Sequence, residues 1–535
     1  MNIKIRVACA YLTPEGIVAD SVSNPKFADY RVVADENAYS LYASSAFAPA
    51  GVTARIPLDA NEIDAVFMNG FQSATDSREQ YIKEKNRRSA YAFYAFDEIF
   101  GVGCPIKKYK NKPGITYGFS YCYFKSGDKI KLFASLDESC GYTVFRYDAT
   151  RSELVVKKDI EGVECFEDYK ALSLFYAEGE ENEVFDAWFA KLPKSDNDPA
   201  PKLIGYSTKK LNFINDSVID YKLSAVKGCF PVKPNVYIID GDYCLAGDWM
   251  APCEERFPSG LRPLSDMIRE AGLMAGLCIS PFTVSVDSFV YEEHKDWLLK
   301  TKNGRYIKAN KDTFVLDSEN EEVRSYVHEV LHTILYMWGF DLVKLDDLYL
   351  AGIVPSGGKS RGEKMCAAMR FLRECCGGKL MYADDVPLMP AFRLADYCAI
   401  SGASVANLLP EAYTQRFYRE SSSVRNASAN IVFRRALNKR AFMSAPCYIS
   451  LDDKESFYDG KLNYAEQNVL TNLEGLFTSV AIVNDTGAAY EQKKKRRFKK
   501  MCELENAEDV KVKRVSDGFF VTYKFKGKSF VVKFK

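Results

Sequence analysis

The central part of the chain constrains the fold most, because buried-looking strands alternate there with amphipathic helices. The helical stretches include Leu264–Ala271 and Glu321–Trp338. Continuous apolar strands joined by helical crossovers are typical of a parallel sheet covered on both faces. The alternation extends over about 280 residues, which suits a (β/α)8 barrel. The predicted strands are VYIID (236–240), LMAGLCIS (273–280), DLVKLDD (341–347), KLMYADD (379–385) and TSVAIVND (478–485).

The two flanks of this region have the alternating pattern of half-buried strands. A chain of 535 residues is too long for one compact domain, so two or three are expected. Residues 1–195 contain short alternating runs such as Lys129–Ala134 and Tyr142–Tyr147, separated by turns, and predict a β-rich N-terminal domain. The barrel is predicted for residues 196–490. Residues 491–535 predict a small antiparallel β domain.

Composition excludes several kinds of partner and compartment. Lysine plus arginine equals aspartate plus glutamate at 72 each, so no net field favours nucleic acid or an anionic membrane. The 15 cysteines are scattered without CxxC pairs, which predicts reduced thiols. The N-terminus, MNIKIRVACAYL, alternates like a strand and lacks the apolar core of a signal peptide. No apolar run reaches the roughly 20 residues that span a bilayer. These features predict a cytoplasmic protein.

Acidic residues follow several predicted barrel strands. They are Asp240, Asp346 with Asp347, Asp384 with Asp385, and Asp485. In (β/α)8 barrels the residues at the C-terminal strand ends line the active site. Any single aspartate there could instead cap a helix. Acids at successive strand ends favour a site, and two carboxylates facing one pocket are what glycoside hydrolysis requires.

The stretch from Gly247 to Asp347 resembles the family 36 α-galactosidases, a melibiase-like family of glycoside hydrolases. Further runs in both flanks are similar to the same family, so the resemblance covers most of the chain. The runs are GDW (247–249), FPSGLRPLSDMIREAGLMAGL (257–277), SPFTVSVDS (280–288), EEHKDWLL (292–299), FVLD (314–317), WGFDLVKLDDLYLAG (338–352), VPLMPAFRLADYC (386–398), NKRAFMSAPCYISLDD (438–453), FMNGFQSATDSRE (67–79) and SLDESCGYTVF (135–145).

The resemblance implies an N-terminal β-supersandwich, a catalytic barrel and a C-terminal β domain. It implies retaining hydrolysis of small α-glycosides, α-galactosides by default, without a metal or another cofactor. Some relatives transfer galactosyl groups instead of hydrolysing them. A homo-oligomer is also left open, because relatives often form oligomers. No nucleic-acid or membrane partner is implied.

The family nucleophile lies in a K-x-D motif that closes the fourth barrel strand. This motif falls on Lys344-Leu345-Asp346, so the resemblance makes Asp346 the nucleophile. Lys344 and Asp240 are implied to orient the sugar, and Trp249 of the GDW run is implied to contact the substrate. A carboxylate beside an ammonium stays ionised at neutral pH, as a nucleophile must.

The acid/base position of the family is altered in this chain. The family pattern R-I-G-x-D places its arginine on Ala399 and its aspartate on Ala403, or on Ser404 with one inserted residue. Neither residue supplies a proton as a carboxylic acid does. General acid catalysis contributes about 10²–10⁴-fold to a rate, so the substitution removes a large contribution to the rate of hydrolysis.

Sugar contacts differ from the family as well. Its tandem Asp-Asp after the first barrel strand reads Asp240-Gly241-Asp242, with one acid in register and one displaced. Cys278 stands where the family has the tryptophan of G-L-W. Ala74 stands where a tryptophan follows Gly-Phe-Gln-Ser.

New acids suggest a way in which the lost proton donor is replaced. Asp384, followed by Asp385, stands at the cysteine of the family's G-C-G motif, and Asp347 replaces an apolar residue. Crowding near Asp346 raises the pKa of a carboxyl, as a general acid needs. Under one interpretation Asp384 or Asp385 donates the proton, with Asp384 the first candidate. Under the other, the protein is a catalytically degenerate homologue that binds carbohydrate.

Three further motifs are assigned to structure rather than to chemistry. His328-Glu-Val-Leu-His332 matches the HExxH zinc motif, but no third ligand is identifiable and the helix is predicted on the outer wall of the barrel. Gly357-Gly358-Lys359-Ser360 lacks the spacing of a phosphate-binding loop and is predicted as a flexible loop. The basic run Lys493–Lys500 is predicted as a solvated helix face. No metal site is therefore predicted.

Overall fold

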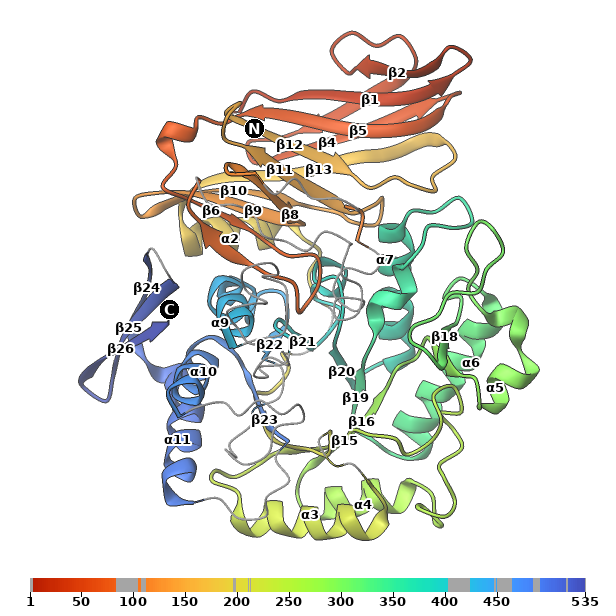
Figure 1. The fold of residues 1–535 in the computed structure, drawn as a ribbon, viewed down its shortest axis with the longest axis vertical. Coiled ribbons are helices and arrows are strands. Elements are labelled where there is room, and N and C mark those ends of the chain that lie inside the picture. The colour runs from red at the N-terminus through yellow and green to blue at the C-terminus, as the bar shows by residue number, and fades with distance from the viewer. Residues whose placement is uncertain are drawn as a thin grey trace.

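The computed structural model shows three parts that pack against one another. A red-to-yellow β-sandwich lies above the barrel in Figure 1, and a small blue sheet lies beside the barrel. Statements on structure refer to the described residues, which are 3–82, 104–106, 112–195, 199–209, 211, 213–402, 424–446, 449, 464–484, 491–515 and 518–534.

The N-terminal part is a sandwich of two antiparallel sheets. Its strands are β1 (Arg6–Thr13), β2 (Gly16–Ser21), β3 (Asp29–Ala34), β4 (Ala38–Ser45), β5 (Ala48–Pro57), β6 (Ala65–Met68), β7 (Arg78–Gln80), β8 (Ile115–Phe119), β9 (Tyr121–Ser126), β10 (Lys129–Ser135), β11 (Thr143–Asp148), β12 (Glu153–Lys158) and β13 (Phe166–Glu180). One sheet has the order β2-β1-β5-β12-β11-β8 and the other β3-β4-β13-β10-β9-β6-β7. Inward-facing side chains alternate along β1, so Cys9 and Tyr11 join the core between the sheets. The predicted β-sandwich fold is confirmed.

The sandwich contacts the barrel through buried aromatic and charged side chains. Strand β13 leads directly into α2 (Glu181–Lys191), whose fully buried Trp188 packs against Phe392 of the barrel. Arg361 pairs with Asp159 at 3.0 Å and with Glu161 at 2.6 Å. These contacts hold one end of the sandwich over the barrel (Figure 1).

Eight parallel strands form a nearly closed barrel in the centre of the molecule. They are β14 (Leu203–Ser207), β15 (Val236–Ile239), β16 (Met274–Ile279), β19 (Leu342–Leu345), β20 (Leu380–Ala383), β21 (Tyr397–Ala399), β22 (Met443–Ala445) and β23 (Val480–Val483). Strand β14 pairs with both β15 and β23. The remaining gap is bridged where the Ser479 N–H donates to the Ser444 carbonyl at 2.9 Å. All five predicted strands belong to this barrel, whereas β14, β21 and β22 were not predicted.

Helices surround the barrel as the crossover pattern predicts. Those of the barrel region are α3 (Asp216–Cys229), α4 (Arg262–Glu270), α5 (Phe289–Glu293), α6 (Glu321–His332), α7 (Arg361–Cys376), α9 (Val424–Phe433) and α10 (Tyr464–Phe477), with a hairpin of β17 (Thr283–Ser285) and β18 (Thr313–Val315). Short turns are η1 (Ala60–Glu62), η2 (Lys295–Trp297), the π-turn η3 (Thr333–Met337), η4 (Leu348–Gly352), η5 (Met389–Ala391), η6 (Arg435–Leu437) and η7 (Leu504–Asn506). Helix α6 exposes His328 and His332, which confirms the expected outer position. Ser360 caps α7 through reciprocal bonds with Glu363, a structural role for the GGKS run.

The C-terminal part combines a helix with a three-stranded antiparallel sheet. The helix is α11 (Gln492–Glu503), and the strands are β24 (Glu508–Val515), β25 (Gly518–Phe525) and β26 (Lys528–Phe534). The basic run lies on α11, but it differs from the predicted solvated face. Phe498 is fully buried, and the Lys500 ammonium contacts Asn472 of α10 at 2.9 Å and Tyr523 of β25 at 3.0 Å. Part of the basic run therefore joins α11 to its neighbours.

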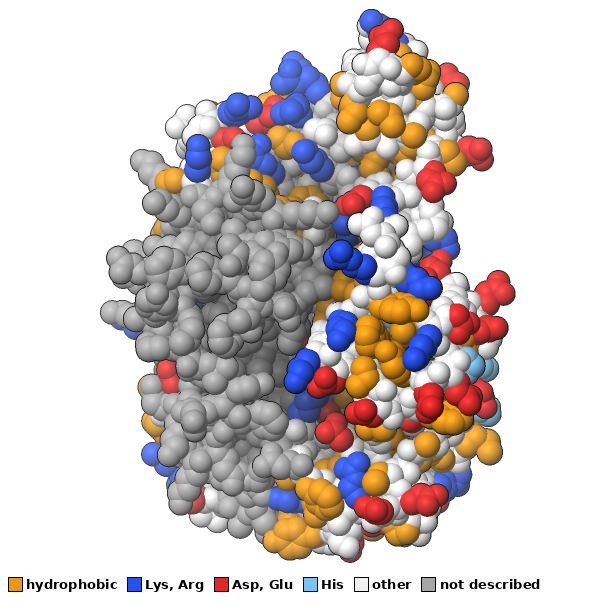
Figure 2. All heavy atoms as spheres, turned by 45° about the vertical axis from the view of Figure 1, so that its right-hand side comes forward, with side chains coloured by type: hydrophobic (Ala, Val, Ile, Leu, Met, Phe, Trp, Pro, Cys, Tyr) orange, Lys and Arg blue, Asp and Glu red, His pale blue; other side chains and the backbone are white. Residues whose placement is uncertain are grey.

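The surface charges and the cysteines agree with the expectations from the composition. On the face shown in Figure 2, basic and acidic side chains lie intermixed among apolar ones. The cysteines that the structure describes are all free thiols. Within the described part of the chain, no helix combines the length and apolar character needed to cross a membrane.

Candidate active site

A buried ammonium group organises the C-terminal end of the barrel. Lys344 is the third residue of β19, and its side chain is 1% exposed. Its Nζ atom contacts Asp346 directly, lies 3.0 Å from Asp384 and lies 3.8 Å from Asp240. These carboxylates come from the ends of three different strands. A buried charge is stable only where opposite charges surround it, so Lys344 and the three carboxylates stabilise one another.

A second ammonium group reaches the same carboxylates from β14. Lys209 follows this strand by two residues, and its Nζ atom lies 3.2 Å from Asp346 and 3.3 Å from Asp240. The Lys209 side chain is 45% exposed, so it lies at the mouth rather than in the interior. Sequence analysis missed Lys209 because it missed β14. The short run LIGYS is followed by Thr208 and Lys209 and not by the acids that marked the other strands.

The two lysines keep the Asp346 carboxylate ionised. Burial by itself raises the pKa of Asp346, but the charges of Lys344 and Lys209 more than offset burial and hold this pKa below its ordinary value. In return, Asp240 and Asp346 raise the pKa of Lys209 well above its usual range. Asp346 is therefore a carboxylate at any physiological pH, which is the state that a nucleophile or a cation-stabilising group requires.

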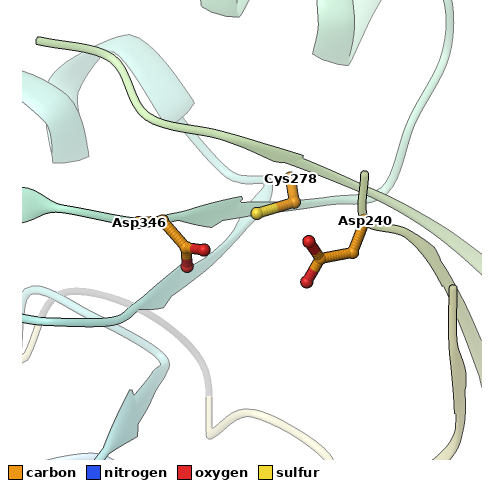
Figure 3. A group of neighbouring side chains, drawn as sticks. All are labelled: Asp240, Cys278 and Asp346. Carbon is orange, nitrogen blue, oxygen red and sulfur yellow. The ribbon is translucent and has the colours of Figure 1, made fainter. Parts of the chain in front are cut away.

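Three potential metal ligands also meet in this cluster. Figure 3 shows the side chains of Asp240, Cys278 and Asp346 pointing toward one another from neighbouring strand ends. One ligand atom from each lies within 4.8 Å of the other two. The Lys344 ammonium contacts Asp346 and lies 3.9 Å from the Cys278 sulfur. Burial raises the pKa of Cys278 well above its ordinary value, which disfavours the thiolate that binds metal. The Lys344 ammonium already supplies a positive charge beside the three potential ligands.

The acids at the end of β20 have different surroundings. Asp384 forms the ion pair with Lys344 and accepts a 2.9 Å hydrogen bond from the Asp385 N–H. Asp385 adopts a left-handed backbone conformation at φ 45°, which costs a residue other than glycine about 1–3 kcal/mol. In the described part of the chain, no lysine or arginine pairs with the Asp385 carboxyl. Strained residues of this kind are concentrated at functional sites.

Burial and neighbouring acids raise the pKa values of the two aspartates at the end of β20. Burial, followed by the charges of Asp384, Asp347 and Asp346, raises the pKa of Asp385 well above its ordinary value. Burial also raises the pKa of Asp384, although Lys344 opposes the shift. Among the described residues, Asp384 has a cationic partner at ion-pair distance and Asp385 has none.

Asp347 is a third acid beside the cluster. It has a left-handed backbone at φ 55°, and the Ser280 hydroxyl donates to its carboxylate at 2.9 Å. Burial and the neighbouring Asp346 charge raise its pKa. Asp346 and Asp347 are consecutive, but only Asp346 contacts the lysines, because successive side chains leave the strand end in different directions.

Two predicted substrate contacts lie outside the cluster. Asp242 is exposed and, among the described residues, forms no ion pair with either lysine. Trp249 belongs to the hydrophobic core, where its carbonyl accepts a 3.1 Å hydrogen bond from Tyr243. Its buried Nε1 atom has no hydrogen-bond partner in the described part of the chain. The family acid/base position, on Ala403 or Ser404, and the strand-end acid Asp485 lie outside the described residues.

Sequence comparison matches part of the chain to α-galactosidases. Residues 239–372 match the melibiase family model. The α-galactosidase Mel36A of Lactobacillus acidophilus is 34% identical over 107 residues, which cover 20% of this chain and 14% of that enzyme. The α-galactosidase AgaA of Geobacillus stearothermophilus is also 34% identical over 107 residues, with the same shares. The matched segments thus span a small part of these relatives.

Solved structures resemble almost the whole chain. The α-galactosidase TtGalA of Thermus thermophilus, in complex with p-nitrophenyl α-D-galactopyranoside, has a TM-score of 0.69 at 22% identity and covers 94% of this chain and 98% of its own. The family 36 α-galactosidase AgaA of Geobacillus stearothermophilus has a TM-score of 0.61 at 12% identity, covering 95% and 74%. At such identities the likeness establishes the shared fold of sandwich, barrel and C-terminal sheet.

Proposed function

Because the chain is a melibiase-like member of glycoside hydrolase family 36, we propose that it is a retaining glycosidase acting on small α-glycosides. The observation that carries this proposal is the ionised Asp346 carboxylate held between Lys344 and Lys209 at the barrel mouth. The relatives are α-galactosidases, so an α-galactoside is the first substrate to test. The reaction needs no cofactor.

In the proposed reaction Asp346 is the nucleophile. Its carboxylate oxygen attacks the anomeric carbon, the glycosidic C–O bond breaks, and a neighbouring carboxylic acid protonates the leaving oxygen. The conjugate base then takes a proton from water, and the resulting hydroxide displaces Asp346 and restores the anomeric configuration. Lys344 and Asp240 are suited to bind sugar hydroxyls, because both lie beside Asp346 at the strand ends.

We assign the proton-donor role to Asp385 rather than to Asp384. A general acid must be protonated at the working pH. Burial raises the pKa of Asp384 too, but its 3.0 Å contact with the Lys344 ammonium opposes that shift and favours the ionised form. Asp385 has three acidic neighbours and a raised pKa, which favours its protonated form. The choice between the adjacent acids therefore follows from which one the lysine contacts.

A second candidate function is carbohydrate binding without hydrolysis. Ala403 and Ser404, at the family acid/base position, cannot donate a proton as an acid. If neither Asp384 nor Asp385 replaces that acid, the site would still present Lys344 and Asp240 to a sugar. Binding and catalysis are distinguished by turnover.

A panel of activated aryl α-glycosides tests the proposal, with Asp346→Ala as the control variant. An activated phenol departs without a proton, so its release reports the nucleophile separately from the acid. We expect release from wild-type protein and a loss of at least ~10³-fold in Asp346→Ala. The anomeric configuration of the first-formed sugar, read by NMR, should be retained.

The possible results separate the two functions. Release that persists unchanged in Asp346→Ala would rule out the assigned nucleophile. Absence of release across the panel, from folded protein that binds galactosides by calorimetry, would instead support the binding homologue. Turnover of an unactivated disaccharide by the wild type would show that a proton donor is present.

A further inference from the structure

We propose that the sandwich supplies part of the catalytic machinery, because its loop of residues 69–77, clamped by Arg434, positions the loop that bears Asp385. The inference rests on the proposed function and deepens it. Arg434 is a positioning residue in this view, since it acts on the acid through intervening backbone. The clamp loop, as we name residues 69–77, connects β6 to β7 at the junction of sandwich and barrel.

Arg434 is fully buried and joins the clamp loop to the barrel. Its Nε atom donates to the Asn69 side-chain oxygen at 3.0 Å, and its guanidinium donates to the carbonyls of Gln72 at 2.9 Å and Ser73 at 2.5 Å. The same guanidinium donates to the Ile400 carbonyl at 2.7 Å, just after β21. A planar guanidinium with several donors in fixed directions can hold these groups in one arrangement.

The clamp loop in turn contacts the chain immediately after Asp385. The Ser73 N–H donates to the Val386 carbonyl at 3.2 Å, and the Ser73 hydroxyl lies 3.4 Å from both the N–H and the carbonyl oxygen of Val386. Gln72 forms an antiparallel β-bridge with Pro387. The sandwich thus extends a short strand-like contact along the residues that follow β20.

This contact restrains a backbone that would not adopt its conformation alone. Asp385 has a left-handed φ of 45°, and its carbonyl accepts a 2.8 Å hydrogen bond from the Tyr349 N–H. With Val386 fixed by the clamp loop on one side and Asp384 fixed by Lys344 on the other, Asp385 is held between two anchors. Strained conformations persist only where the surroundings over-determine them.

Position matters for Asp385 because its neighbours decide its protonation. The charged groups that face it are Asp384, Asp347, Asp346 and Lys344. Moving the carboxyl toward water would reduce both its burial and the repulsion from the three acids. Its titration would then approach that of an ordinary aspartate, and the proton needed for catalysis would be lost at neutral pH.

Arg434→Lys tests the clamp, and Arg435→Lys is the matched control. Lysine keeps the positive charge but cannot reproduce the fork of donors. Arg435 is the next residue and also bridges barrel and sandwich, through an ion pair with Glu181 of α2. Its other hydrogen bond is to the Val432 carbonyl, and among the described residues it makes none with the clamp loop. A general weakening of the domain interface would affect both variants alike.

Two readouts separate positioning from general stability. In Arg434→Lys, we expect kcat/KM for an unactivated α-galactoside to fall about 10- to 100-fold, a share of the general-acid contribution. For an activated aryl galactoside it should change far less. The Asp385 carboxyl, identified by ¹³C NMR of labelled aspartate against Asp385→Asn, should titrate at lower pH than in the wild type. Arg435→Lys should change neither the substrate ratio nor this titration.

Equal losses on both substrates, or an unshifted titration in Arg434→Lys, would overturn the clamp. If Arg434→Lys does not fold, Ser73→Ala gives the decision, because it removes the hydroxyl beside Val386 while keeping the backbone bond. It should shift the ratio and the titration in the same direction, by less. A wild type without turnover would refute the proposed function alone, since the NMR titration still decides whether the clamp holds Asp385.

Discussion

Two neighbouring parts of the barrel mouth place aspartate side chains in opposite charge environments. At the ends of β15 and β19, Asp240 and Asp346 face the ammonium groups of Lys344 and Lys209. At the end of β20, Asp385 faces three other acids, and Lys344 only partly offsets their effect on its pKa. The contrast supports the proposed roles: two ammonium groups favour the ionised form of Asp346, and burial with three acidic neighbours favours the protonated form of Asp385.

Replacing the proposed proton donor Asp385 by a neutral amide should have the largest effect. In Asp385→Asn we expect kcat/KM for unactivated α-galactosides to fall about 10²–10⁴-fold, because the proton donor is gone. With a dinitrophenyl galactoside the loss should be small, and azide should restore turnover of the intermediate. Steady-state kinetics on substrates with leaving groups of different pKa measure the contrast.

Asp384→Asn is the matched variant for this experiment. Asp384 contacts Lys344, so its loss should lower kcat/KM by a similar factor on both kinds of substrate. If Asp384→Asn showed the dependence on leaving group and Asp385→Asn did not, the two acids would have to exchange roles.

Removing the buried ammonium of Lys344 should give the next largest effect, because this group contacts the proposed nucleophile Asp346. In Lys344→Met, kcat/KM should fall about 10²-fold or more, as when one electrostatic partner of a reacting group is deleted. The depressed pKa of Asp346 should rise, so the acid limb of the pH profile moves to higher pH. Stability should also fall by about 3–5 kcal/mol, because the buried Asp384 carboxylate loses its ammonium partner.

The sign of the linked pH effect can be checked in the same variant. A carboxylate with a depressed folded pKa adds stability above its ordinary pKa, and this contribution is lost as pH falls through the folded pKa. Lys344→Met should flatten that acid-side loss in denaturant titrations. Lys364→Met is the control, since this buried lysine of α7 pairs with Asp317 at 3.4 Å and, among the described residues, forms no ion pair with the acids around Lys344. It should lower stability without moving the acid limb.

A smaller effect is expected from the half-exposed lysine. Lys209→Met should change kcat/KM less than about tenfold, because exposed ion pairs contribute roughly 0.2–1 kcal/mol. The acid limb should shift in the same direction as in Lys344→Met, but less. Lys379→Met is a suitable control, as Lys379 pairs with Asp341 at 3.4 Å before β19 rather than after it. An effect larger than that of Lys344→Met would reverse the ranking of the two ammonium groups.

The smallest effect on activity is expected from an acid whose pKa is raised by burial alone. Burial raises the pKa of Glu474 in α10 to about 8. Since the folded pKa exceeds the ordinary one, stability should fall between about pH 4.5 and pH 8 as Glu474 ionises in the unfolded chain first. Glu474→Gln should remove this fall and leave the kcat/KM profile unchanged. A shifted kcat/KM profile would mean that a buried acid away from the lysine cluster, and not the charges at the barrel mouth, determines the pH dependence of catalysis.

Strand pattern and motif spacing predicted the barrel and much of its mouth. The runs at 236–240, 273–280, 341–347, 379–385 and 478–485 are long and apolar, so they could be recognised one by one. The strands β21 and β22 are three residues each, too short for a periodic signal. Strand β14 is flanked by no acid that would have marked it.

Residue identity determined that a K-x-D motif ends β19 and that new acids end β20. Periodicity predicted the barrel and a β-rich N-terminal domain, and the family resemblance implied that this domain is a sandwich. Tertiary structure alone decided which acids the lysines contact. Lys209 reaches Asp346 across 137 residues, and Ser73 reaches Val386 across 313. Such pairs form because barrel closure and domain packing bring distant strand ends together. The charge environment of each carboxyl, and hence its role, therefore depends on neighbours that no local pattern contains.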